Sequence, residues 1–303
     1  MGKAQALRRN QTIAARRRRW AVLGFLGPNL IGFLLFTIFP ISASLVISFY
    51  EWPLLGDAIA VGFKNFLRMF TQDPVFWQIS FNTIYFVAGY IVLNLLVSIG
   101  LAVWLTSGIR FAGLFRFAFF LPVVAPMVAN SVVWRLLFVP DTGLFAAALA
   151  TIGVEAPNWL GSPNWAMPSV ILMSVWAGFG YNMIIFIAGI QAIPASIYEA
   201  AEIDGVNAWT RFRYITFPMI SPSIFFATVM TLISALKVFE QPYILTGGGP
   251  GSSTTTIVFY LYQQGFQNYD LGYASSIAWM LFLVIMFVTA IQFWGQKKWV
   301  HYA

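Results

Sequence analysis

Six long apolar runs constrain this 303-residue chain more than any other feature of its sequence. They lie at about 21–49, 79–105, 114–138, 168–191, 219–241 and 273–294. Each is longer than the ~20 apolar residues that an α-helix needs to cross about 30 Å of hydrocarbon. Little of the chain shows the period-two alternation of a β-strand, and backbone groups in hydrocarbon must be paired internally. The sequence therefore predicts an all-α, polytopic membrane protein with six transmembrane helices.

Composition supports this class and argues against enzymatic chemistry. Charged residues make up 9% of the chain and the mean hydropathy is +0.77, whereas soluble domains carry about 25% charged residues. The chain has no cysteine and only one histidine, His301, so a cysteine nucleophile, a disulfide and a thiolate metal site are excluded. No acid falls near the centre of a predicted span, as a proton- or sodium-driven carrier would require. We therefore expect no catalytic residue and no metal site, and energy for pumping must come from outside this chain.

The distribution of Lys and Arg predicts the orientation. Seven of the seventeen basic residues lie in residues 1–19, directly before the first apolar run. That run is longer than the 7–15 residues of a cleavable signal peptide, so we expect a retained span behind a basic cytoplasmic tail. With the tail inside, the inside segments hold thirteen basic residues and the outside loops only Lys64 and Arg68. This asymmetry predicts N-in and C-in, and the tail suits anionic lipid better than nucleic acid.

A charged interval, 194–218, joins the fourth and fifth apolar runs and falls on the inside in this orientation. Pro194 suits the first turn of a helix, and Ser196 and Glu199 have the spacing of a capping box. Gly205 suits a left-handed C-terminal cap, and Asn207 can cap a second helix. The interval therefore predicts a helix, a glycine break and a second short helix.

The residues of this interval also resemble a motif of a known protein family. Glu199-Ala200-Ala201, Gly205, Ile215 and Pro218 resemble the EAA loop of permease subunits of ABC importers. The full EAAEIDG and ITFP spelling is similar to that of binding-protein-dependent carbohydrate permeases. Similar segments, such as TGGGP at 246–250, extend the resemblance over about 20–295.

The resemblance implies the type I ABC importer permease fold, with one transmembrane domain over 20–303. It implies that the loop is a coupling helix in a cleft of a cytoplasmic ATPase. Carried over by position, the docking residues would be Glu199, Ala200, Ala201, Asp204, Gly205 and Arg211.

The same resemblance implies partners and a location. They are a second, related permease subunit, two ATPase subunits that bind ATP and Mg²⁺, and an extracytoplasmic solute-binding protein. The chain would span the cytoplasmic (inner) membrane of a bacterium or archaeon and bind no cofactor itself. A stand-alone six-helix channel or secondary carrier is the alternative, with the loop as a solvated turn. A purely structural scaffold would leave the Glu-Ala-Ala…Gly pattern unexplained.

Amide and aromatic side chains in the spans are the candidates for a solute pathway, because they hydrogen-bond and stack on sugars. They are Asn130, Trp134, Tyr181, Asn182 and Gln241, with Trp279 of the same kind, and the carboxylate of Glu240 is a further candidate. The alternative for the amides is interhelical hydrogen bonding, and for the aromatic rings it is packing. Lys237 and Glu240 are three apart on the predicted fifth span and can pair. Since only Arg135 and Lys237 are cations within spans, a neutral sugar is favoured over a phosphorylated one. The glycine-rich segment 246–254 lacks Gly-Lys-[Ser/Thr], which argues against a phosphate-binding loop.

Overall fold

The computed structural model describes residues 22–52, 56–298 and 300. The predicted basic tail 1–19 and His301 lie outside the described residues. The first helix, Val22–Ile47, contains a π-helical turn that ends two residues before Pro40. The elements are the π-helix η1 (Leu34–Ile38), α2 (Phe39–Ile47), β1 (Tyr50–Glu51), β2 (Ile59–Ala60), α3 (Lys64–Thr71), α4 (Pro74–Thr106), α5 (Ala112–Val124), α6 (Met127–Leu137), α7 (Leu144–Ala150), α8 (Pro163–Gln191), α9 (Ala195–Ile203), α10 (Ala208–Arg211), η2 (Phe212–Thr216), α11 (Phe217–Met219), α12 (Ser221–Leu236), α13 (Glu240–Thr246), α14 (Ile257–Tyr262), η3 (Gln263–Gln267), α15 (Leu271–Gly295) and η4 (Gln296–Lys298).

Helices dominate the described residues, with one antiparallel pair of two-residue strands, β1 and β2. Four helices are long and apolar enough to span a membrane: the first helix, α4, α8 and α15. Two bent pairs, α5 with α6 and Ala208–Met219 with α12, raise the number to six if each is one span. These six segments coincide with the six predicted runs, so the predicted all-α membrane fold is confirmed.

The third predicted span, 114–138, is not one continuous helix. Its two halves, α5 and α6, meet at 100°. Pro126, which has no N–H to continue a helix, forms the N-cap of α6. Asn130 Nδ2 donates to the carbonyl oxygen of Pro122 at 2.9 Å, so it satisfies a backbone acceptor next to the break. The fifth predicted span, 219–241, also differs from the structure, because its helix, α12, already ends at Leu236.

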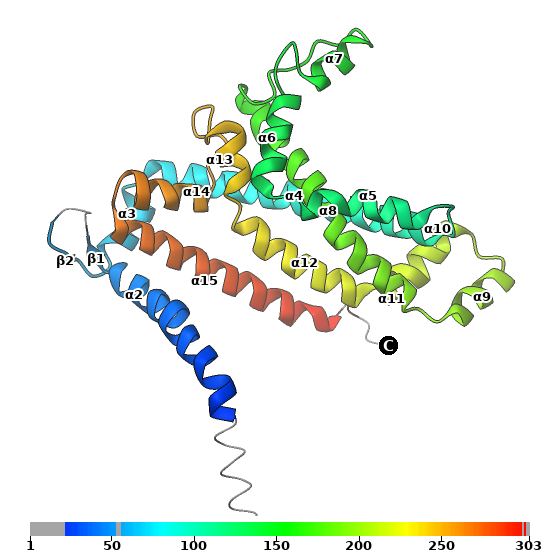
Figure 1. Ribbon diagram of the computed structural model, residues 1–303, viewed down its shortest axis with the longest axis horizontal. Helices are drawn as coiled ribbons and strands as arrows, with labels where there is room; N and C mark the ends of the chain where they lie inside the picture. Colours follow the sequence, from blue (N-terminus) through cyan, green and yellow to red (C-terminus); the bar gives the residue numbers. More distant parts are fainter. Residues whose placement is uncertain (1–21, 53–55, 299, 301–303) are drawn as a thin grey trace, which may run out of the picture.

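The long helices lie side by side in one bundle (Figure 1). Helix α4 packs along α8, which also contacts α5 and α12, and α15 packs against α12. Lipid is as apolar as a leucine side chain, so interhelical hydrogen bonds and close packing hold such a bundle. Asn182 of α8 donates to Asn94 Oδ1 of α4 at 2.7 Å and to Thr231 Oγ1 of α12 at 2.8 Å. This buried amide therefore ties three spans together.

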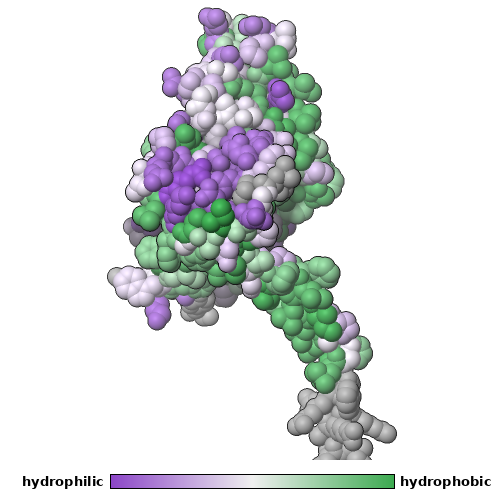
Figure 2. Space-filling view, turned by 90° about the vertical axis from the view of Figure 1, so that its left-hand side faces the viewer, coloured by the Kyte–Doolittle hydropathy of each residue, from purple (hydrophilic) through white to green (hydrophobic). Residues whose placement is uncertain are grey.

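The first helix diverges from the bundle (Figure 1), and none of its most apolar stretch is buried within the chain. In Figure 2 it projects as an apolar rod beside the hydrophilic end of the molecule. Trp279 of α15 donates to Ser44 Oγ at 3.2 Å and so connects the C-terminal part of the first helix to the bundle. Its apolar surface is therefore free for lipid or another chain.

A polar network fastens the end of the bundle that the charge distribution places outside. Asp73 caps α4 by accepting from the N–H groups of Val75 and Phe76 at 3.1 and 3.2 Å. Its other oxygen accepts from the hydroxyls of Tyr260 and Tyr273. Burial raises the pKa of Tyr260, and its hydrogen bond to Asp73 raises that pKa further, so its hydroxyl remains a donor at neutral pH.

Beside this carboxylate, Arg68 forms an ion pair with Asp270 at 2.7 Å and lies 4.2 Å from the centre of the Tyr273 ring. Helices α3, α4, α14 and α15 thereby meet around two carboxylates, Asp73 and Asp270, and one guanidinium. Side-chain hydrogen bonds of Asn82 to Ser252 and Thr255 oxygens, at 2.7 and 3.1 Å, fasten the glycine-rich segment to α4 in the same way.

We expect Asp73→Asn to lower the free energy of unfolding by about 2–3 kcal/mol. An amide retains one acceptor for the cap but turns an NH₂ group toward two tyrosine hydroxyls, which leaves buried donors unpaired. Thermal unfolding of the chain in mild detergent measures this loss. Asp57→Asn is the control, because Asp57 is exposed. Equal unfolding temperatures for the two variants would contradict the structural role of Asp73.

Candidate docking elbow and solute cavity

Residues 194–218, hereafter the elbow, connect α8 to α12. Helix α9 ends at Ile203 with Asp204 as its C-cap, and Gly205 follows with φ +68°. The N–H of Val206 donates to the Ala201 oxygen at 3.0 Å, and that of Gly205 donates to the Glu202 oxygen at 3.1 Å. This pair of bonds is a Schellman cap, which confirms the predicted left-handed end.

The start of the second short helix also agrees with its prediction, but the start of the first does not. Asn207 Oδ1 accepts from the N–H of Thr210 at 2.9 Å and caps α10. The predicted capping box of Ser196 and Glu199 is wrong, because α9 begins at Ala195 with Pro194 as its N-cap and without a side-chain cap. Ser196 is therefore already inside the helix.

The elbow is joined rigidly to the bundle. The hydroxyls of Tyr198 and Thr216 lie 3.1 Å apart and link α9 to η2. A core cluster at this end of α8 and α12 includes Ile190, Ile193 and Ile220, and side chains of the elbow pack against it. These are Ile197, Tyr198 and Phe217. A force on the elbow is therefore transmitted to both spans.

Three large side chains of the elbow stay exposed: Ile203 at 87%, Trp209 at 71% and Tyr214 at 74%. They belong to α9, α10 and η2. Large apolar side chains that stay exposed on a connection between helices are typical of a surface that contacts another protein or the membrane. Figure 1 places α9 at the end of the bundle opposite α3 and α14, away from the hydrophilic face of Figure 2.

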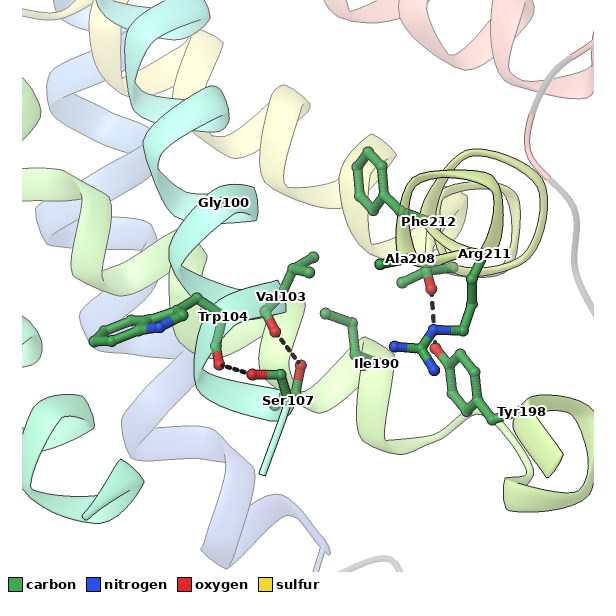
Figure 3. A pocket seen from close by; sticks show the side chains of 11 residues that line it. Gly100, Val103, Trp104, Ser107, Ile190, Tyr198, Ala208, Arg211 and Phe212 are labelled. Carbon is green, nitrogen blue, oxygen red and sulfur yellow. Dashed lines mark hydrogen bonds between the residues drawn. The ribbon is translucent and has the colours of Figure 1, made fainter. Parts of the chain in front are cut away.

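The predicted docking residues divide between this surface and the interior. Glu199, Ala200, Asp204 and Gly205 are exposed. Ala201 is 5% exposed, so its methyl group packs within the chain. Arg211 is half-buried and lines a cavity behind the elbow (Figure 3). Contact between these residues and an ATPase stays a prediction.

The predicted pathway residues also divide into two groups. Asn130, Trp134 and Asn182 are buried and already engaged, the amides as described above. Trp134 packs among aromatic rings that include Phe138 and Trp176. These three residues hold helices together in this conformation.

Glu240 and Gln241, in contrast, line a cavity of about 490 Å³ where α12 gives way to α13. Its other lining residues are Met127, Ser234, Lys237, Val238 and Phe239. The predicted pairing of Lys237 with Glu240 on one helix is wrong, because α12 ends at Leu236 and α13 begins at Glu240. Among the described residues, the ion pairs are Lys64–Glu51 and Arg68–Asp270. Tyr181 is 47% exposed on α8.

Comparison with known proteins identifies the kind of membrane protein. Residues 94–299 match the family described as binding-protein-dependent transport system inner membrane component. The matched residues include the elbow and five of the six membrane segments, with α4 matched only in part. The chain belongs to this family. We refer to it below as the permease.

Relatives of the permease align over nearly its whole length. The probable ABC transporter permease protein YesP of Bacillus subtilis is 37% identical over 99% of this chain and 97% of its own. The lactose transport system permease protein LacF of Rhizobium radiobacter is 35% identical over 90% and 93%. A chain of a bacterial ABC transporter that imports the polysaccharide alginate has the same fold, with a TM-score of 0.84 over 95% and 99% and 24% identity.

Sequence reasoning about the permease missed the exposed apolar face of the elbow. The exposure of Ile203, Trp209 and Tyr214 could not be read from the sequence, because Ile197, Phe212 and Phe217 of the same interval are only partly exposed. It also did not find the polar network at the other end of the bundle, because Tyr260 lies 187 residues from Asp73 and Asp270 lies 202 residues from Arg68.

Proposed function

We propose that the permease is one of two membrane subunits of an ATP-driven importer for a carbohydrate, and that the elbow couples it to a cytoplasmic ATPase. The observation that carries this proposal is the exposed face of Ile203, Trp209 and Tyr214 on an elbow packed onto two spans. Relatives named as permeases for lactose, arabinooligosaccharides and trehalose or maltose support a carbohydrate. ATP and Mg²⁺ would be bound by the ATPase subunits.

Alternating access follows from the rigidity of the elbow. When two ATPase subunits close on ATP, an elbow held between them moves as one body. Because its apolar side chains pack on α8 and α12, those spans must tilt with it. The 68° bend at the start of α12 and the 100° bend between α5 and α6 are places where such a tilt can be absorbed. The energy comes from the ATPase, and the permease converts it into a change of helix orientation.

The cavity at the start of α13 suits a neutral, hydroxyl-rich solute. Lys237 and Glu240 contribute one charge of each sign, Gln241 contributes an amide, and Phe239 contributes a ring. Sugars are held by such hydrogen-bonding groups together with aromatic faces. Tyr181, which is half exposed on α8, can contribute where the pathway continues toward the elbow.

Two further partners account for surfaces that the chain leaves uncovered. The diverging first helix exposes apolar side chains along its whole length, which suits packing against a second permease subunit in the membrane. The hydrophilic end in Figure 2 suits an extracytoplasmic solute-binding protein. An alginate transporter of the same fold has been crystallised with its periplasmic binding protein.

We expect Trp209→Ser to weaken co-purification of the ATPase subunit with the permease by roughly tenfold or more, since a central tryptophan commonly contributes about 2 kcal/mol to a protein interface. ATP-driven sugar uptake in reconstituted vesicles should fall in parallel. Trp165→Ser is the matched control, because Trp165 is also exposed but lies at the other end of α8. Sugar flux through the purified permease alone, unchanged by Trp209→Ser, would instead identify a stand-alone channel or carrier.

A further inference from the structure

A second cavity, of about 520 Å³, lies between the elbow and the nearby ends of α4 and α8 (Figure 3). Its lining combines apolar walls with a few polar groups. The residues that matter here are Trp104 and Ser107 at the end of α4, Ile190 of α8, and Tyr198, Arg211 and Thr216 of the elbow. It is separate from the solute cavity, which is lined by residues of α6, α12 and α13.

Arg211 is the charged group of this cavity and has no anion beside it. Its guanidinium lies 5.9 Å from the centre of the Tyr198 ring. Within the part of the chain that the structure describes, no carboxylate lies within ion-pair distance of it. A half-buried guanidinium with unused donors favours an anion, because charge-assisted bonds to phosphate or carboxylate are short and strong.

A second donor is available next to the guanidinium. The hydroxyls of Tyr198 and Thr216 are 3.1 Å apart, and one donates to the other. The accepting hydroxyl keeps its own proton, which is available to another acceptor. Tyr198 and Thr216 line the same cavity as Arg211, and Figure 3 shows the Tyr198 ring near the Arg211 head group. A ligand with at least two acceptor oxygens and one negative charge would satisfy both groups.

The position of the cavity selects the kind of anion. It lies where the spans α4 and α8 end, which is the level of the membrane interface. Trp104 on its wall is 43% exposed, and Phe115 and Phe117 on the adjoining α5 are exposed as well. Arg110, in the connection from α4 to α5, is also exposed. Basic pockets between spans on the cytoplasmic side bind phospholipid head groups.

We propose that this cavity binds the phosphate of an anionic phospholipid from the inner leaflet. Arg211 would be the charged hydrogen-bond donor to the phosphate, and the Tyr198–Thr216 hydroxyl pair would be a second donor. The lipid would bridge the end of α4 and the elbow, and its acyl chains would lie along the exposed rings of α4 and α5. This role assigns Arg211 to the membrane rather than to ATPase docking, and it holds whichever solute the permease carries.

The test is retention of phosphatidylglycerol by the full-length permease, purified in mild detergent and measured by native mass spectrometry. We expect the wild type to retain phosphatidylglycerol in preference to phosphatidylcholine, and Arg211→Gln to weaken that retention about tenfold, as loss of a charge-assisted phosphate contact implies. Arg213→Gln is the matched control. It removes the same charge two residues away, but Arg213 is exposed and does not line the cavity. Thr216→Val should give a smaller loss.

Equal retention by the wild type, Arg211→Gln and Arg213→Gln would overturn the site. Inorganic phosphate that binds with the same dependence on Arg211, while phosphatidylglycerol does not, would overturn the lipid assignment. Unfolding temperatures of the variants show whether a loss comes from misfolding. Since lipid retention is measured without ATPase or sugar, its failure is distinguishable from failure of the proposed transport function.

Discussion

Gly272→Ala is expected to destabilise the permease by at least about 3 kcal/mol, the range of severe overpacking. A Cβ atom at Gly272, in the first turn of α15, would lie 1.9 Å from the carbonyl oxygen of Tyr50 and 3.0 Å from its carbon. Both are backbone atoms, so no side chain can rotate away. The Tyr50 carbonyl is itself fixed, because Asn65 donates to it at 2.9 Å and to the Ser48 oxygen at 3.0 Å. The methyl group must therefore push α15 away from the chain between the first helix and α3.

Thermal unfolding in detergent measures the loss, and the same helix provides the control. Gly295 lies at the other end of α15, where an added Cβ would meet no atom within 4 Å. Gly295→Ala should be neutral or stabilising by up to about 1 kcal/mol, since alanine favours helix more than glycine does. Similar unfolding temperatures for the two variants would show that the contact with Tyr50 does not constrain α15.

The number of spans was predictable from the sequence because hydrocarbon imposes a length on every apolar run. The bends inside two of them were not. Pro126 was visible in the sequence, but many membrane helices continue through a proline when neighbours satisfy the freed carbonyl. The structure shows a 100° change of direction instead, with Asn130 bonded to Pro122 across it.

Some features of the elbow likewise have causes close in the sequence, and others depend on residues far along the chain. Its Schellman cap at Gly205 and the cap by Asn207 depend on neighbours within six residues, so local spacing predicts them. The inward direction of Ala201 and the position of Arg211 depend on how the elbow folds back on α4 and α8. The hydrogen bonds of Asn182 could not be predicted from local sequence, because its partners Asn94 and Thr231 lie 88 and 49 residues away.

The largest functional effect is expected from Gly205→Val, which should lower ATP-driven uptake while leaving the permease folded. Gly205 has φ +68° and is exposed, and an added Cβ would meet nothing within 4 Å. The cost is therefore backbone strain, about 1–3 kcal/mol for a side chain held in the left-handed region. A β-branched residue relieves that strain by opening the Schellman cap, which changes the angle between α9 and α10.

This strain corresponds to a roughly 5- to 150-fold lower population of the docking geometry, since every 1.4 kcal/mol is a factor of ten. The rate of uptake by vesicles that contain the assembled transporter should decrease by a factor within that range. Gly205→Asn is the decisive comparison, because asparagine adopts the left-handed conformation more readily than other side chains. The asparagine variant should retain more uptake than the valine variant, although it too replaces glycine with a residue that has a side chain. If both variants transport equally well, the angle set by Gly205 does not control coupling, and the elbow acts through its side-chain contacts alone.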